Sequence, residues 1–271
     1  MNNETIIIID YGSQYTQLIT RRIREENVHS IIIPYDFKVS YINKYKIAGI
    51  ILSGGPSSVY EKNSPKLNEI IFSYNVPILG ICYGLQLLIE YNNGSVKNIG
   101  TGEYGRADVN IKNKNNLFKN ITLTFKAWMS HGDKIEKMPD GWDITSLSEN
   151  NVISSVQNEV KNIYGVQFHP EVMHTDQGQD MIKNFIFNIC NVSPNWSSEN
   201  FIKSTIESIR KTVGDNKVMC ALSGGVDSTV VSTLMKHAIG DNAICVFIDH
   251  GLLRKNEAQE VVDMFNESLD L

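Results

Sequence analysis

A turn-forming segment in the first third of the sequence most constrains what this chain can fold into. Residues 78–86 place Cys82 between Gly80 and Gly84, directly after an apolar run and directly before a helix-like run. A strand that turns this sharply into a helix needs glycines, because a Cβ would obstruct the close backbone packing. The helix start also offers free N–H groups and a positive dipole end, which favour a thiolate over a thiol. The segment predicts a nucleophile elbow that presents Cys82 as a reactive cysteine.

Strand-like and helix-like segments alternate along the rest of the first half. This alternation predicts parallel strands joined by crossover helices, hence an α/β fold with an open, mostly parallel sheet flanked by helices. The strand-like runs are 6–9, 29–33, 49–52 and 77–81, and the helix-like runs are 14–26, 65–74 and 177–189. Residues 107–166 are richer in strand-forming sequence and are compatible with added antiparallel hairpins.

A base for the cysteine is offered by the sequence Phe-His-Pro-Glu that ends at Glu171. The apolar run 163–168 delivers His169 at its carboxyl end, where open α/β sheets place their chemistry. Glu171 can orient the imidazole, so that the other ring nitrogen takes the thiol proton. A lone cysteine is more often an inert core residue, and a lone His-Pro-Glu is more often a strand-ending loop. Both together, each at a strand end, favour a catalytic pair.

Backbone donors for a developing negative charge are expected at two turns. The apolar run 49–52 continues into Ser-Gly-Gly-Pro, which leaves backbone N–H groups such as that of Gly55 uncovered. The N–H of Tyr83, the residue after the cysteine, is the expected partner in an oxyanion hole. An ordinary strand-ending turn is the alternative interpretation of the Gly-Gly-Pro sequence.

These three blocks resemble the signatures of class I glutamine amidotransferases, in order and separation, over roughly residues 1–190. The resemblance implies that Cys82 attacks the side-chain amide of glutamine, His169 shuttles the proton and Glu171 orients His169. Ammonia leaves, and a γ-glutamyl thioester is hydrolysed to glutamate without a cofactor. The resemblance also implies residues that contact the substrate glutamine, namely Gln86 and, in the turn 130–133, Ser130 and His131.

Three further segments narrow the resemblance to the amidotransferase part of the GMP synthetase family. They are residues 9–16, the Glu-Tyr-Gly sequence 103–105 and residues 172–175. The last of these departs from the family pattern, because Met173 stands where a threonine is expected.

The second half carries an independent signal at the end of the apolar run 217–222. Glycines and hydroxyls follow this run and precede a helical run, an arrangement that cradles phosphate with backbone amides and a helix N-terminus. The sequence contains no Walker A motif. Instead the loop and the segment 246–254 resemble ATP pyrophosphatases, although a plain Ser-Gly-Gly turn is the alternative. The resemblance implies that Asp227 helps to hold Mg²⁺ and that ATP is bound by Ser223, Gly224, Gly225, Val226, Asp227, Ser228 and Thr229.

Composition sets outer limits on the class of protein. The chain has 271 residues, 42% of them hydrophobic, which is enough for two domains. We expect an amidotransferase domain at 1–190, a linker at 191–198 and an ATP pyrophosphatase domain at 199–271, with Ser198 as a helix N-cap. The net charge of −5 argues against a nucleic-acid partner, and the absence of a long apolar stretch argues against a membrane. Four cysteines without paired spacing favour a reducing cytoplasm.

The second domain is short for its class. The sequence predicts only two strands and two helices after the phosphate loop. In the last helix, Val261, Val262, Phe265 and Leu269 form an apolar stripe that must bury against something. We therefore expect a truncated chain with an incomplete Rossmann-like ATP pyrophosphatase domain, lacking the dimerisation domain of the homodimeric complete enzyme.

The resemblance implies synthesis of GMP from XMP, with ATP converted to AMP and pyrophosphate and with ammonia from glutamine. This chain is expected to carry the glutamine-hydrolysing half and only part of the ATP site. Two alternatives remain: a stand-alone glutaminase subunit of another synthetase, and a non-catalytic remnant that binds a nucleotide or a partner.

Overall fold

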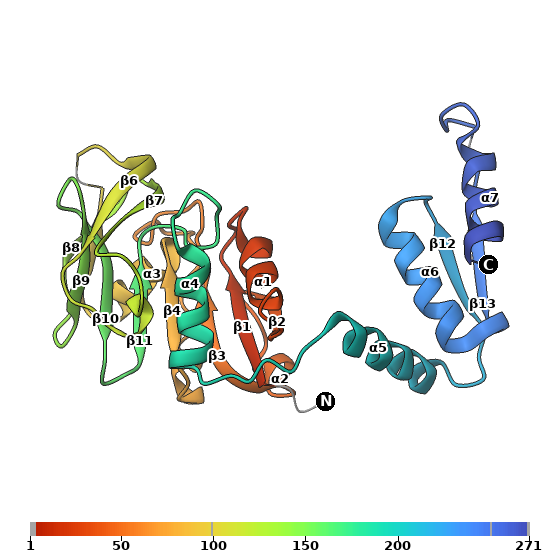
Figure 1. Cartoon of the computed structure of the whole chain (residues 1–271), viewed down its shortest axis with the longest axis horizontal. Coiled ribbons are helices and arrows are strands. Elements are labelled where there is room, and N and C mark those ends of the chain that lie inside the picture. Colours follow the sequence, from red (N-terminus) through yellow and green to blue (C-terminus); the bar gives the residue numbers. More distant parts are fainter. Residues whose placement is uncertain (1–3, 99, 250, 270–271) are drawn as a thin grey trace. The chain divides into compact units, whose positions relative to one another are not determined.

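The structure is a computed structural model that describes residues 4–98, 100–249 and 251–269. The chain forms two compact units, residues 1–196 and 197–271, and each is described by itself (Figure 1). The predicted outer domain bounds at residues 1 and 271 lie outside the described residues. Among the described residues, no helix combines the length and apolar character needed to span a bilayer.

A nine-stranded sheet forms the centre of the first unit, in the order β2-β1-β3-β4-β11-β10-β9-β6-β7. The first five strands in this order are parallel to one another, and the other four add on antiparallel. The parallel strands are β1 (Glu4–Asp10), β2 (His29–Pro34), β3 (Lys46–Leu52), β4 (Ile78–Ile81) and β11 (Ile163–Val166). The antiparallel strands are β6 (Glu103–Ile111), β7 (Thr124–His131), β9 (Asp143–Ser148) and β10 (Ile153–Asn158). The predicted α/β class is confirmed, and the strand-rich region does supply the antiparallel part.

Helices cover both faces of this sheet, because alternate residues of a buried strand point to opposite faces. On β1, Ile6 and Ile8 pack in one apolar cluster with α1 (Thr16–Arg24), while Ile7 and Ile9 pack in a second cluster with α3 (Tyr83–Tyr91). The first face also holds α4 (Gly178–Lys183) and the π-helical η3 (Asn184–Ile189), and the second holds α2 (Val39–Ile42) and η1 (Glu69–Tyr74). Figure 1 shows α4 in front of the sheet and α3 behind it.

Three short elements complete the first unit. A separate antiparallel pair consists of β5 (Ser95–Lys97) and β8 (Lys134–Lys137), and η2 (Asn116–Phe118) is a 3-10 turn. The helix predicted at 65–74 is shorter in the structure, where only Glu69–Tyr74 is helical, as a 3-10 helix. It begins there because the Asn68 side chain accepts a hydrogen bond from the Ile70 N–H and thereby caps it.

The second unit contains one parallel strand pair with three helices. Its elements are α5 (Ser198–Val213), β12 (Val218–Leu222), α6 (Val226–Ile239), the 3-10 turn η4 (Gly240–Asn242), β13 (Ala243–Phe247) and α7 (Glu257–Leu269). The predicted N-cap at Ser198 is wrong. Ser197 is the cap, because its hydroxyl accepts a hydrogen bond from the Asn200 N–H.

The apolar stripe of the last helix is only partly buried. Val261 and Phe265 are buried, whereas Val262 is 41% exposed. The side chain of Leu269, the fourth residue of the predicted stripe, lies outside the described residues. Val261 packs against the loop that follows β12, since a Cβ added to Gly224 would lie 2.7 Å from its Cγ2 atom. The buried side of α7 is therefore narrower than the apolar stripe that the sequence predicted.

Candidate active site

The turn from β4 to α3 carries Cys82 in a strained backbone conformation. Its φ and ψ are 51° and −105°, a region that residues with a side chain rarely adopt. The neighbouring glycines permit the turn: a Cβ at Gly80 would lie 2.6 Å from the Leu85 nitrogen, and one at Gly84 would overlap the Leu52 carbonyl oxygen. The helix can pack this closely on β3 and β4 only because both positions lack a side chain.

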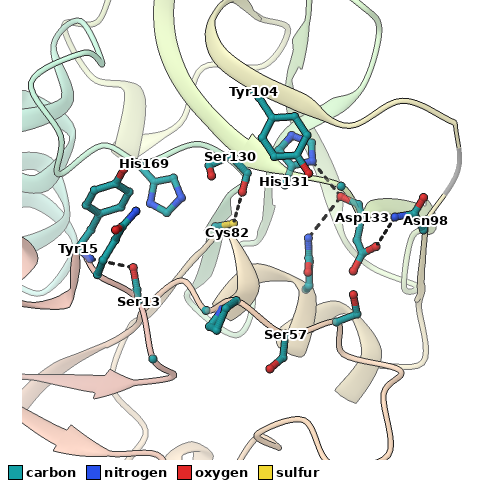
Figure 2. A pocket seen from close by; sticks show the side chains of 17 residues that line it. Ser13, Tyr15, Ser57, Cys82, Asn98, Tyr104, Ser130, His131, Asp133 and His169 are labelled. Carbon is teal, nitrogen blue, oxygen red and sulfur yellow. Dashed lines mark hydrogen bonds between the residues drawn. The ribbon is translucent and has the colours of Figure 1, made fainter.

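His169 comes from the strand next to the one that ends at the cysteine. β11 pairs in parallel with β4, and the Cys82 N–H donates to the Val166 carbonyl oxygen at 2.8 Å. Parallel neighbours release their loops at the same edge of the sheet, so both side chains emerge there. A Cβ added to Gly54 would lie 3.0 Å from His169 Cε1 and 3.7 Å from Cys82 Cβ. The thiol and the imidazole therefore share one small space at the edge of the sheet (Figure 2).

The carboxylate of Glu171 fixes the imidazole of His169 through its Nδ1 atom, on the ring edge opposite Nε2. His169 Nδ1 lies 2.8 Å from Glu171 Oε1, and both side chains are buried. The Tyr15 ring meets the imidazole edge-on at 5.1 Å between ring centroids. Burial lowers the pKa of His169, but the Glu171 carboxylate and the Cys82 sulfur outweigh burial and hold that pKa well above its ordinary value of 6.5. The arrangement favours a protonated imidazole next to the sulfur.

The residues that carry the two expected oxyanion donors, Gly55 and Tyr83, pack closely together. A Cβ at Gly55 would lie 3.2 Å from the Tyr83 ring and 2.7 Å from the Tyr11 carbonyl oxygen. Tyr83 is the first residue of α3, where a backbone N–H has no partner within the helix. Among the described residues, no hydrogen bond from the N–H of Gly55 or Tyr83 is seen outside helices and strands.

A cavity of about 600 Å³ opens above the cysteine and the histidine. Gln86, Ser130 and His131, the residues expected to contact a substrate, all line this cavity. Gln86 Nε2 donates to the Asp133 carbonyl oxygen at 3.4 Å and to Gln167 Oε1 at 3.3 Å. The Ser130 carbonyl oxygen lies 3.8 Å from Cys82 Sγ. The cavity is thus lined mostly by polar groups, and Cys82 lies among them (Figure 2).

Comparison with known proteins decides the family. The family model for class-I glutamine amidotransferase matches residues 7–189, which is more than half of the chain and covers every residue of the site. The chain belongs to the class I glutamine amidotransferase family. The predicted family resemblance is confirmed, and the second unit matches the NAD synthase family model over residues 197–270.

Named relatives agree with this amidotransferase assignment. The chain is 48% identical over 269 residues to a glutamine-hydrolyzing GMP synthase of Bacillus cereus, covering 99% of this chain and 52% of that protein. It is 46% identical over 270 residues to a GMP synthase of Brachyspira hyodysenteriae, covering 100% of this chain and 52% of that protein. The chain therefore spans about half the length of these relatives.

Two solved structures resemble the amidotransferase in fold. One is a candidate GMP synthase subunit from Thermoplasma acidophilum, with a TM-score of 0.61 and 29% identity, covering 75% of this chain and 99% of that chain. The other is a glutamine amidotransferase from Thermotoga maritima, with a TM-score of 0.52 and 17% identity, covering 99% of this chain and 100% of that chain. The second likeness concerns the fold alone.

The amidotransferase site contains contacts that the sequence did not predict. Gln167 Nε2 donates to Cys82 Sγ at 3.6 Å, and Asp133 Oδ1 accepts from Tyr60 Oη at 2.9 Å and from Asn98 Nδ2 at 3.3 Å. The polar Gln167 in an otherwise apolar strand end was the available signal. Tyr60 and Asn98 offered none, because loops far apart in sequence bring them to Asp133.

The imidazole of His131 contacts a different group at each of its two ring nitrogens, and one of these groups is the buried carboxylate of Glu103 on β6. His131 Nδ1 lies 2.9 Å from the Asp133 carbonyl oxygen, and its Nε2 lies 3.2 Å from Glu103 Oε2. Burial raises the pKa of Glu103, but the nearby His131 ring and the hydrogen bonds from Asn150 and Ser148 outweigh burial and lower that pKa to about 2. Glu103 therefore stays ionised and fixes the ring that lines the cavity.

The loop between β12 and α6 forms the second candidate site of the amidotransferase chain. Ser223 Oγ and Ser228 Oγ lie 3.2 Å apart, the Gly225 N–H donates to Ser223 Oγ, and Gly224 has a φ of 74°. The helix begins at Val226 without a side-chain cap, so no side chain of the N-cap residue satisfies the N–H groups of its first turn. The remaining predicted ligands, Asp227 and Thr229, lie in that first turn, where Thr229 Oγ1 donates to the Gly225 carbonyl oxygen.

Proposed function

We propose that the chain hydrolyses glutamine with Cys82 as nucleophile, His169 as proton carrier and Glu171 as the residue that orients His169. The observation that carries this proposal is the strained turn at Cys82, placed beside a histidine whose Nδ1 is held at 2.8 Å by Glu171 Oε1. A carboxylate on one ring nitrogen leaves the other to exchange a proton with the thiol.

In the first half of the reaction, the Cys82 proton passes to His169 and the sulfur attacks the side-chain amide carbon of glutamine. The oxygen that becomes negative accepts hydrogen bonds from the N–H groups of Gly55 and Tyr83. His169 then gives its proton to the amide nitrogen, the carbon–nitrogen bond breaks and ammonia leaves. The product is a γ-glutamyl thioester on Cys82.

In the second half, water replaces ammonia. His169 takes a proton from the water, the hydroxide attacks the thioester carbon and the carbon–sulfur bond breaks. Glutamate is released and the thiol is restored, so the cycle needs no metal or cofactor. Gln86, Ser130 and His131 are the proposed contacts for glutamine, supported by their position on the walls of the cavity.

For the whole reaction we propose glutamine-dependent synthesis of GMP from XMP, with ATP converted to AMP and pyrophosphate. The proposal is supported by relatives named as GMP synthases and by the match of the second unit to the NAD synthase family model. The assigned domains are 1–190 for glutamine hydrolysis and 199–271 for ATP, with 191–198 as linker. We also propose that a complete enzyme of this kind uses XMP as the acceptor of ammonia and is a homodimer. A reducing cytoplasm is the proposed location, supported by four free cysteines.

The loop 223–229 is the proposed site for the pyrophosphate end of ATP. The uncapped N–H groups of a helix start and two hydroxyls suit phosphate oxygens. The described residues contain no group of three His, Cys, Asp or Glu side chains that would hold a metal by themselves. A single exposed carboxylate at Asp227 fits Mg²⁺, because this ion binds through one or two carboxylates together with substrate phosphates.

A glutaminase assay on the purified chain tests the proposed chemistry. Glutamate release is expected with the unchanged protein and is expected to disappear in Cys82→Ala. An electrophilic glutamine analogue should label Cys82 covalently, as judged by peptide mass spectrometry. Glutamate release that is unaffected by Cys82→Ala would refute the nucleophile. Calorimetric titration with ATP and Mg²⁺ separately tests the loop, with Asp227→Ala as the matched variant.

A further inference from the structure

The two strands of the second unit bring two cysteines directly opposite each other. β12 and β13 pair in parallel with Cys220 in register with Cys245. Opposite residues of a parallel pair point to the same face of the sheet, and neighbouring strands lie about 4.8 Å apart. A disulfide bridges Cα atoms about 4.4–6.8 Å apart. The register therefore places both thiols on one face and within bridging range.

The surroundings of the two thiols differ. Cys220 is buried, whereas Cys245 is half-buried and lines a cavity of about 440 Å³ beside Lys236. Burial raises the pKa of Cys245 and the neighbouring Cys220 thiol raises it further, while Lys236 opposes this rise. Cys245 is the thiol that a small reagent reaches, and Cys220 is the thiol held next to it.

We propose that Cys220 and Cys245 form a reversible thiol–disulfide site that reacts with low-molecular-weight disulfides. The Cys245 thiolate attacks one sulfur of the small disulfide, forms a mixed disulfide and releases one small thiolate. The Cys220 thiolate then attacks the Cys245 sulfur, closes the intramolecular disulfide and releases the second small thiolate. The small disulfide is reduced to two thiols, which take up the two protons that the cysteines lose.

The other cysteines do not share this arrangement. Cys190 belongs to the first unit, where it is partly buried and its Sγ lies 2.5 Å from the position that a Cβ on Gly49 would take. Cys82 belongs to the amidotransferase cavity. The proposed site lies on β12, the strand that leads into Ser223, so a cross-link there would tie the base of the candidate phosphate loop to β13.

The test uses the full chain carrying Cys82→Ala, so that the amidotransferase nucleophile cannot exchange. The folded protein is incubated with oxidised glutathione and mapped by peptide mass spectrometry without reduction. The expected product is one cross-linked peptide pair that contains Cys220 and Cys245, and dithiothreitol should reverse it. A matched Cys190→Ala variant should give the same product.

Two single variants separate the steps. Cys220→Ser should accumulate a stable glutathione adduct on Cys245, and Cys245→Ser should leave Cys220 largely unmodified. A glutathione adduct that persists on Cys245 while Cys220 is present would overturn the proposal. Cross-links to Cys190 that are as frequent as those between Cys220 and Cys245 would overturn it as well, because they would show no preference for the paired cysteines of β12 and β13.

Discussion

At the scale of single residues, the site depends on charges that lie very close together in a buried place. His169 and Glu171 are both buried, and their hydrogen bond is 2.8 Å long. An ionised carboxylate in such surroundings favours the charged imidazolium, against the effect of burial. Removing the charge while keeping the shape should therefore change the proton affinity of His169 more than its position.

Replacing Glu171 by glutamine should lower the pKa of His169, because the carboxylate that raises it is lost. The glutaminase kcat should fall by about 10²-fold or more, as is typical when general acid–base catalysis is impaired. The alkaline limb of kcat/KM against pH, which reports loss of the His169 proton, should move to lower pH. A variant with reduced kcat and an unmoved alkaline limb would show that Glu171 acts on structure alone.

Gly54→Ala probes the space that the thiol and the imidazole share. The added methyl group would lie 3.0 Å from His169 Cε1 and would push the ring away from Cys82. A displacement of about 1 Å is expected to reduce kcat about 10²-fold. The free energy of unfolding, measured in urea, should change far less than the activity. A fully active Gly54→Ala protein would contradict the placement of His169.

At the scale of elements, one carboxylate connects the antiparallel strands to the cavity. Glu103 begins β6, accepts hydrogen bonds from Ser148 Oγ at 2.7 Å and Asn150 Nδ2 at 2.9 Å, and lies against His131 at the end of β7. Its side chain thus ties three segments together at one end of the sheet. A charge that is buried with this many donors stabilises the fold only while it is ionised.

Glu103 should make the stability of the first unit depend on acid pH. Its pKa in the folded chain is about 2, below its ordinary value of 4.5. Its contribution is therefore present above pH 4.5 and is lost as pH falls toward about 2. Urea unfolding of Glu103→Gln should show a smaller loss of stability over this pH range than the unchanged protein. Glu149→Gln, at an exposed neighbouring position, is the control and should retain the full pH dependence.

At the scale of the whole molecule, the two units differ in how completely they bury their sheets. The parallel strands of the first unit are covered on both faces by helices. In the two-stranded sheet of the second unit, Met219 and Ile244 are 73% and 43% exposed. A two-stranded sheet with an exposed apolar face has a weak core of its own.

Hydrogen exchange measured by mass spectrometry on the intact chain should separate the two units. Amides of β12 and β13 should exchange much faster than those of β1, β3 and β4, because local opening exposes less apolar surface in the second unit. Equal protection in both strand groups would show that the second unit is as stable as the first. ATP with Mg²⁺ should slow exchange in residues 223–229 if that loop binds phosphate.

Local sequence predicted the elements near the site well. The glycines around Cys82 and the apolar run before His169 fix a turn and a strand end over a few residues. Helix ends were less predictable. Ser197 and Ser198 are both suitable caps, and Ser197 is the cap because its backbone is extended and its hydroxyl accepts a hydrogen bond from the Asn200 N–H. The contacts of Asp133 with Tyr60 and Asn98 could not be predicted, because they join loops from different parts of the chain.

The sequence by itself determined the order of strands and helices, the elbow at Cys82 and the family to which these motifs point. These features follow from periodicity and turn chemistry, which act between residues close in the chain. Only the tertiary structure decided that β11 lies beside β4, which puts His169 next to Cys82, and that Cys220 faces Cys245. Strand neighbours and register are set by the packing of distant apolar side chains, an energy that no short segment of sequence contains.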